Sequence, residues 1–300
     1  AYFKACQSQS DKDFLLIPAE EMNQYLGGHW GILFPKPVYW FMKRAPGEPF
    51  QSTDPKYGTV YRAGSDKDML ALVHAESGLM YQTHPRTKGS TGFPDKIRDS
   101  EQFRDPRYLG AGWKAMPSDL SSPRLGERAF KTIDDANNWG LRKRMIAEVD
   151  VFQLDTTHEL YGHMNINYVR LPELPAFAHY GEVLAAMSKG EYFITTGEIL
   201  LPELTITPLA GDRLRVRAQV NYTFPLRMAE IVWGDGSETH RKIFRLSATR
   251  EFGNTQFTWE ADAKGWKWAR VAVWDVAGNG AFVNPIWRSN PPGVTSRNSR

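Results

Sequence analysis

Short apolar runs alternate with helix-like patterns along the first 200 residues of the chain. Short apolar runs that end at a proline or a turn are typical of buried strands, and apolar positions three or four residues apart are typical of helices. The predicted strands cover 14–17, 30–34, 79–83, 148–154 and 192–195, and the predicted helices cover 66–77, 128–147 and 181–190. Because strands and helices alternate, we expect an α/β domain with a parallel sheet, either open or closed into a barrel.

One stretch, residues 87–126, interrupts this alternation. It is rich in Gly, Pro, Ser, Asp and Arg and has little periodicity. Long irregular segments in compact domains are usually functional loops or lids. We therefore interpret it as a loop near a functional site. The alternative is an insertion that has no functional role.

After Leu200 the pattern changes to strict alternation. Apolar and polar residues alternate over 214–222 (LRVRAQVNY), a second strand is predicted over 270–274, and the glycine-flanked triplets 234–236 and 278–280 are turn signals. No helical pattern lies between these strands, so the pattern predicts an antiparallel β-sandwich.

These patterns divide the chain into two domains and a tail. We assign 1–200 to the α/β domain, 203–289 to the β-sandwich and 290–300 to a polar tail. Hydrophobic residues make up 41% and charged residues 24% of the chain, as in ordinary globular proteins. The chain starts at Ala1 in what reads as the middle of a helix, so we expect an upstream segment to be missing.

Charge and composition limit the partners. The net charge is +3, the basic residues are scattered, and the densest run, 142–144, is interpreted as the solvated face of a helix, so no nucleic-acid partner is expected. No segment approaches the roughly 18 apolar residues of a membrane span. The single Cys6 excludes an intrachain disulfide. We expect a soluble protein, cytoplasmic or exported, of undetermined oligomeric state.

Four residues near predicted strand ends are candidate metal ligands. His29 follows two glycines at the start of an apolar strand, and His84 follows the strand 79–83. Glu20 and Glu21 come shortly after the run that ends at Pro18. Metal-dependent hydrolysis needs His and carboxylate side chains that converge from strand ends, although each residue alone could be structural.

The densest group of possible ligands lies between Asp155 and His163. His158 and His163 are five residues apart, about 140° around a helix, so they do not form the i, i+4 pair of a zinc-protease helix. A loop could still bring Asp155 and one of these histidines to the same ion.

The order of the motifs resembles the PHP (polymerase and histidinol phosphatase) superfamily, and most closely its carbaryl-hydrolase-like metallohydrolase branch. The similar segments are 17–23 (IPAEEMN), 28–30 (GHW), 84–86 (HPR), 186–198 and 281–287 (AFVNPIW). The resemblance implies a distorted (β/α) barrel followed by a β-sandwich. It also implies that Glu21 bridges metal ions and that His29 and His84 are ligands.

The chain departs from that family in two places. The family opens with a His-x-His strand, and no His-x-His occurs here, so we expect that strand upstream of Ala1. The family also closes with a Ser-Asp-x-His segment, for which Asp155 with His158 or His163 is the best substitute.

The resulting hypothesis is a hydrolase of a small-molecule phosphoester or carboxyl or carbamate ester, acting through a metal-bound hydroxide. Two or three divalent ions, zinc or manganese/iron, are expected. Asp155 would be a ligand or general base, and His158 or His163 a further ligand or proton donor. Arg86 could bind an anionic substrate or form a surface salt bridge. The principal alternative is a non-catalytic, degenerate barrel whose sandwich binds glycan or protein. A third alternative is a nuclease, but the sequence lacks the basic groove pattern that a nuclease needs.

Overall fold

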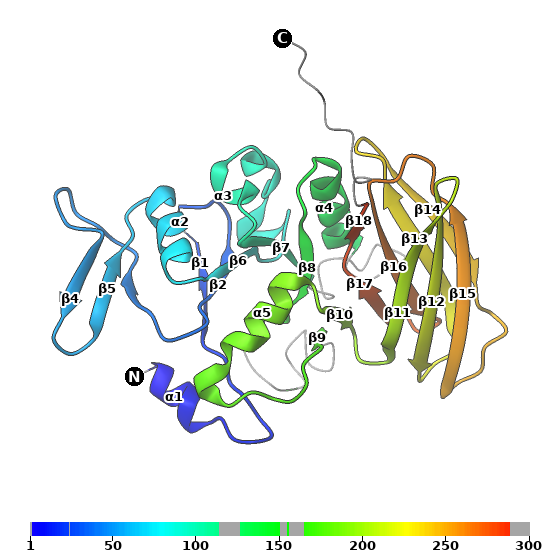
Figure 1. Cartoon of the computed structure of the whole chain (residues 1–300), viewed down its shortest axis with the longest axis horizontal. Coiled ribbons are helices and arrows are strands. Elements are labelled where there is room, and N and C mark those ends of the chain that lie inside the picture. Colours follow the sequence, from blue (N-terminus) through cyan, green and yellow to red (C-terminus); the bar gives the residue numbers. More distant parts are fainter. Residues whose placement is uncertain (1, 24, 114–126, 151–154, 156–164, 289–300) are drawn as a thin grey trace, which may run out of the picture.

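A computed structural model describes residues 2–23, 25–113, 127–150, 155 and 165–288. Strands outweigh helices in these residues. Figure 1 shows an α/β part at one end of an elongated molecule and stacked sheets at the other, with two short strands, β9 and β10, between them. In this part of the chain, no helix is long and apolar enough to cross a bilayer.

A five-stranded mixed sheet forms the centre of the N-terminal half. The strand order is β1-β2-β6-β7-β8, with β1, β2 and β6 antiparallel and β6, β7 and β8 parallel. The strands are β1 (Ala19–Met22), β2 (Trp30–Leu33), β6 (Leu79–Gln82), β7 (Tyr108–Trp113) and β8 (Arg144–Ala147). Helices α3 (Glu101–Arg104) and α4 (Glu127–Asn138) lie in the connections between the parallel strands.

The prediction of a (β/α) barrel is wrong. The sheet is open among the described residues, and only β6, β7 and β8 run parallel to one another. The connection from β2 to β6 instead contains a separate three-stranded sheet of β3 (Tyr39–Phe41), β4 (Gln51–Asp54) and β5 (Gly58–Arg62), followed by α2 (Asp66–Ala75). A short apolar run is compatible with parallel and antiparallel neighbours alike, so the pattern could not separate these arrangements.

Several predicted elements are confirmed within a few residues. Helix α2 begins after Ser65, whose hydroxyl accepts a hydrogen bond from the Asp68 backbone N–H. Helix α5 (Gly181–Lys189) ends at Gly190 in the left-handed conformation, with φ of 81°. The remaining helices are α1 (Tyr2–Ser8) and the 3-10 turns η1 (Lys88–Ser90), η2 (Asp95–Ile97) and η3 (Phe177–His179).

Four predicted segments differ from the structure, one of them the strand 148–154, whose described residues 148–150 follow β8 and are not in a strand. Residues 14–17 do not form a strand, and β1 begins at Ala19. The predicted helix 128–147 is α4 followed by β8, and the irregular stretch 87–126 contains α3 and β7. Gly110, in β7, pairs with Arg144 of β8. A Cβ on Gly110 would lie 1.8 Å from the Arg144 carbonyl oxygen, so the position requires glycine. Such glycines lower the β-propensity of a real strand.

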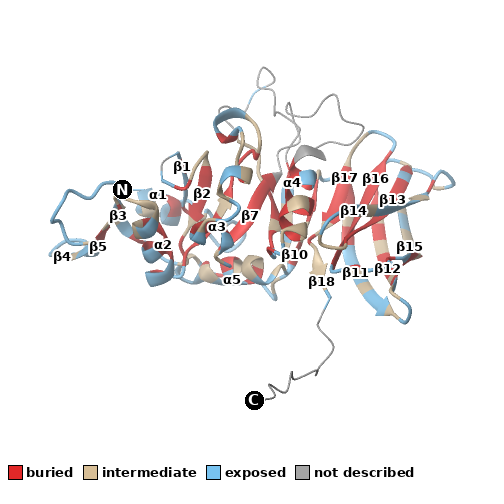
Figure 2. Cartoon of the chain, turned by 90° about the horizontal axis from the view of Figure 1, so that it is seen from above, coloured by how far each residue is buried: buried red, intermediate tan, exposed pale blue. Residues whose placement is uncertain are grey.

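The predicted β-sandwich is confirmed. One sheet has the order β14-β13-β16-β17-β10-β9, with β18 paired to β16, and the other has the order β11-β12-β15. Figure 2 shows that β16 and β17, in the first of these sheets, are largely buried. The strands are β9 (Ile166–Val169), β10 (Tyr192–Thr195), β11 (Ile199–Leu209), β12 (Arg213–Tyr222), β13 (Leu226–Gly234), β14 (Thr239–Arg245), β15 (Gly253–Asp262), β16 (Trp268–Asp275), β17 (Gly280–Val283) and β18 (Ile286–Trp287).

Side-chain amides join the two halves. The Asn167 amide donates to the Ala147 carbonyl (3.0 Å) and its oxygen accepts from the Ala147 N–H (2.8 Å). The Asn284 oxygen accepts from the Met145 N–H at 2.8 Å. These amides take the place of a neighbouring strand for β8, whose edge groups would otherwise lack partners. The larger sheet of the sandwich also includes β9 and β10, which come before residue 203, the predicted start of the sandwich.

Candidate metal centre

Three side chains that are distant in sequence converge at one end of the five-stranded sheet. Glu21 lies in β1, His29 immediately before β2 and His84 shortly after β6. One potential ligand atom from each lies within 4.8 Å of the others. Glu21 Oε1 is 3.4 Å from His29 Nδ1 and 3.2 Å from His84 Nε2. The structure therefore brings together the glutamate and both histidines that the sequence singled out.

The antiparallel pairing of β1, β2 and β6 explains this convergence. Met22 pairs with Trp30, and Trp30 pairs with Gln82. Glu21, next to Met22 in β1, therefore lies at the same end of the sheet as His29, which precedes Trp30, and His84, which follows Gln82 by two residues. Here the end of β1, the start of β2 and the end of β6 meet, which differs from the parallel strand ends on which the prediction was based.

His84 is the most rigidly held of the three. Its side chain is 4% exposed, whereas those of Glu21 and His29 are 45% and 38% exposed. The His84 backbone N–H donates to Glu148 Oε1 at 2.7 Å, and its φ of 30° lies in the left-handed region. A non-glycine residue in that region stores backbone strain, which is often found at functional sites.

Hydrogen bonds orient two of the candidate ligands. His84 Nδ1 lies 3.4 Å from the Thr87 carbonyl oxygen, so a proton on Nδ1 leaves the Nε2 lone pair directed at Glu21. The Thr83 hydroxyl donates to Glu21 Oε1 at 2.8 Å. The Thr87 carbonyl raises the basicity of the His84 imidazole, and both contacts fix the orientation of the candidate ligands.

The buried Ser90 holds His29 from the loop after β6. Its hydroxyl oxygen accepts from the His29 backbone N–H (2.9 Å), and its hydroxyl group donates to the Thr83 carbonyl (2.9 Å). Gln82 also donates to the His29 carbonyl. Gly89 packs on the His29 imidazole so closely that a Cβ would lie 2.3 Å from Nε2. The segment 87–90 therefore packs against the candidate metal centre, and the functional-loop interpretation of 87–126 stays a prediction.

An open cavity of about 620 Å3 lies beside these residues. Glu21, Thr83 and His84 line it, together with Tyr81 and Glu148, which the sequence analysis missed. Glu148 comes directly after β8, so a correct strand boundary would have placed it at the carboxyl end of a parallel strand. The position of Tyr81 carried no such signal, because a tyrosine in a strand is ordinary core.

The other predicted site residues are placed differently. Arg86 donates two hydrogen bonds to Asp95, at 2.8 and 2.7 Å, and its Nη2 lies 2.7 Å from Asp135 Oδ2. These carboxylates raise the pKa of Arg86 and occupy its guanidinium group. Asp155 is exposed and outside the Glu21–His29–His84 group. His158 and His163 lie outside the described residues.

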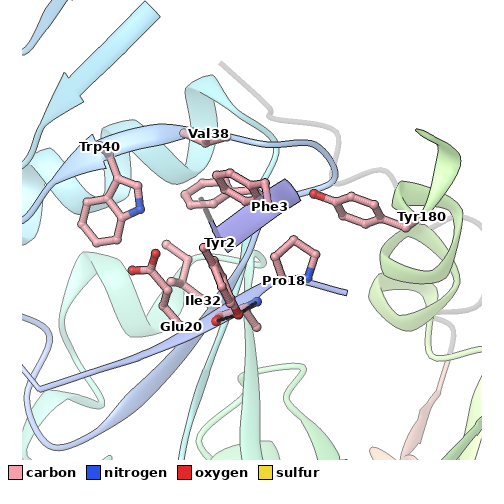
Figure 3. Close-up of a pocket in the computed structure, with 10 residues that line it drawn as sticks. Tyr2, Phe3, Pro18, Glu20, Ile32, Val38, Trp40 and Tyr180 are labelled. Carbon is pink, nitrogen blue, oxygen red and sulfur yellow. Dashed lines mark hydrogen bonds between the residues drawn. The ribbon is translucent and has the colours of Figure 1, made fainter. Parts of the chain in front are cut away.

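A second hollow lies on the other side of β1 (Figure 3), where the aromatic rings of Tyr2, Phe3 and Trp40 surround Glu20. Glu20 lines both this hollow and the cavity beside Glu21. Burial raises the pKa of Glu20. The hollow measures about 10 Å3, room for roughly one water molecule. Of these two hollows, the cavity beside Glu21, at about 620 Å3, is the one with room for a substrate.

The donor set suits a divalent transition metal. Two imidazole nitrogens and one carboxylate oxygen are the protein ligands of several catalytic zinc sites, which leave further coordination positions open. Because Glu21 and His29 are partly exposed, an ion can reach them from solvent. The buried His84 supplies a nitrogen in a fixed position. Residues of this type and spacing fit such an ion.

Comparison with known proteins adds no relative: no protein-family model, curated protein or solved structure matches the chain. The resemblance to the PHP superfamily stays a prediction, and functional inference relies on the geometry of the site.

Proposed function

We propose that this protein is a divalent-metal-dependent hydrolase of an ester-like bond. The observation that carries the proposal is the convergence of Glu21, His29 and His84 at the edge of a substrate-sized cavity. Surface carboxylates often cluster without a metal, but a buried imidazole held through Nδ1 with Nε2 facing a carboxylate is typical of a ligand.

A bound divalent ion would lower the pKa of a coordinated water toward neutrality and polarise the substrate oxygen. His84 would hold the ion at the cavity wall, and Thr83 would keep Glu21 oriented toward it. Zinc, manganese and iron all accept imidazole and carboxylate ligands. The group supplies ligands for one ion, and Glu148 in the same cavity is a candidate ligand for a second.

The resemblance to the PHP superfamily supports both phosphoesters and carboxyl or carbamate esters as substrates. The cavity lining supports a substrate with an apolar part, because Ala19, Gly31, Ala147 and Val149 lie among the polar groups. A three-ligand site with adjacent apolar walls is a common arrangement in small-molecule hydrolases.

Metal loading and activity test the proposal together. The protein is stripped with a chelator and reloaded with zinc or manganese, and bound metal is measured alongside hydrolysis of aryl phosphates and aryl esters. We expect at least one ion per chain and metal-dependent hydrolysis. His84→Ala should lose both.

A matched control is His240→Ala in the sandwich, where the imidazole contacts Asp235 at 3.0 Å. This variant should keep the metal and the activity. Less than one ion per chain with no hydrolysis of either substrate class would refute the hydrolase and favour the non-catalytic binding protein.

A further inference from the structure

Tyr81 projects from the middle of the five-stranded sheet into the cavity of the candidate metal centre. It lies in β6 two residues before Thr83, so both side chains point to the same face of the sheet. Thr83 donates to Glu21, and Tyr81 lines the cavity beside it. The phenol is therefore on the same side of the sheet as the candidate ligands.

A glycine on the neighbouring strand directs the ring toward Glu21. Gly31 pairs with Tyr81 on one side and with Glu21 on the other. The Tyr81 ring lies over Gly31, where a Cβ would be 2.5 Å from Cε1 and 3.0 Å from the hydroxyl oxygen. Any other residue at position 31 would displace the ring, so this arrangement depends on the absence of a side chain.

Glu148 and Glu21 line the same cavity as Tyr81. Burial, followed by the negative charges of Glu148 and Glu21, raises the pKa of Tyr81 above its usual value of 10.0. The phenol therefore stays protonated in neutral and mildly alkaline solution. Among the described residues the hydroxyl makes no hydrogen bond. A protonated phenol at a cavity wall is a donor that is available to a ligand.

We propose that the Tyr81 hydroxyl donates a hydrogen bond to the substrate oxygen on which negative charge develops during hydrolysis. The inference rests on the proposed function and assigns a catalytic residue that the candidate ligand set does not include. Tyr81 keeps its proton throughout, so no proton transfer is assigned to it. A fixed donor directed at developing charge stabilises the transition state more than the ground state.

Tyr81→Phe tests this role, because it removes only the hydroxyl oxygen. We expect kcat to fall by about 100-fold to 1,000-fold on an aryl ester or aryl phosphate. KM, bound metal per chain and the midpoint of urea unfolding should stay near the wild-type values. For aryl-ester hydrolysis, affinity for an aryl phosphonate that mimics the tetrahedral transition state, measured by calorimetry, should fall in parallel with kcat.

Tyr61→Phe is the matched control. Tyr61 is buried in the α/β part and its hydroxyl donates to Glu76 Oε1 at 2.5 Å, away from the cavity. It should retain kcat. Gly31→Ala provides a second test, since it keeps the phenol but displaces its ring, and it should lower kcat while metal binding is retained.

The two proposals fail in different ways. Absence of metal-dependent hydrolysis in the wild-type protein would refute the proposed function. Normal wild-type hydrolysis with an unchanged kcat and unchanged phosphonate affinity in Tyr81→Phe would refute only the role of Tyr81. Loss of metal together with activity in Tyr81→Phe would also overturn it, because the hydroxyl would then act on the metal site.

Discussion

Removing the charge of Asp134 is expected to destabilise the protein strongly. Asp134 in α4 accepts two hydrogen bonds of 2.7 Å from Arg270 in β16, so this pair links the α/β part to the sandwich. The two side chains are 6% and 1% exposed. The guanidinium carbon of Arg270 also lies 4.9 Å from the centre of the Phe130 ring. Both charges are therefore removed from water.

The magnitude follows from this burial. Removing one partner of a buried ion pair leaves a charge without compensation and typically costs about 3–5 kcal/mol. Glu230 lies 3.9 Å from Arg270 Nη1 and keeps part of the compensation in Asp134→Asn. We therefore expect a loss near the lower end, about 3 kcal/mol. At about 2–4 °C per kcal/mol for a domain of 150–250 residues, the expected fall in Tm is on the order of 10 °C.

Urea unfolding followed by circular dichroism and tryptophan fluorescence measures this loss. Glu260→Gln is the control, because Glu260 pairs with Arg215 at 2.7 Å on the sandwich surface with side chains 38% and 37% exposed. Water screens that pair, so the variant should unfold like the wild type. Equal stability losses in the two variants would refute the reasoning from burial.

Three further predictions concern other buried polar groups. Ser90→Ala removes the hydroxyl that bonds His29 and Thr83; metal affinity measured by calorimetry should fall about tenfold or more, and unchanged affinity would contradict this. Burial lowers the pKa of Lys143 to about 7 from 10.5, so the unfolded state binds more protons and stability should rise from about pH 7 to about pH 10.5. Lys143→Met should flatten that rise in urea unfolding at several pH values. Asn284→Ala removes the acceptor for a backbone N–H of β8 and should cost about 1–3 kcal/mol by urea unfolding; a loss below that range would indicate another partner.

Backbone carbonyl groups accept hydrogen bonds from the buried amine of Lys143. Its amine lies 3.0 Å from the Asp105 carbonyl oxygen and 2.5 Å from that of Tyr108. A neutral amine has two N–H donors, one for each carbonyl. The interpretation of 142–144 as a solvated helix face was wrong at this position, because Lys143 is 3% exposed and follows α4.

The candidate site was predictable where its residues have unusual local signals. His29 follows two glycines and His84 follows a short apolar strand, so both positions stand out in the amino-acid sequence itself. Glu148 was missed because a strand was predicted to begin at this residue, whereas β8 ends just before it, at Ala147. Tyr81 was missed because its role depends on Gly31, a residue fifty positions earlier that only sheet pairing brings beside it.

Sequence alone determined the elements whose patterns are local. Alternation over 214–222 predicted β12, and the apolar spacing of 66–77 predicted α2, because residues within one element set its buried face. The tertiary structure alone decided the strand order, the open mixed sheet and the joining of β9 and β10 to the sandwich. Those features depend on hydrogen bonds between strands far apart in sequence. A short apolar run can pair with several different neighbours, so the sequence pattern does not specify which pairing forms.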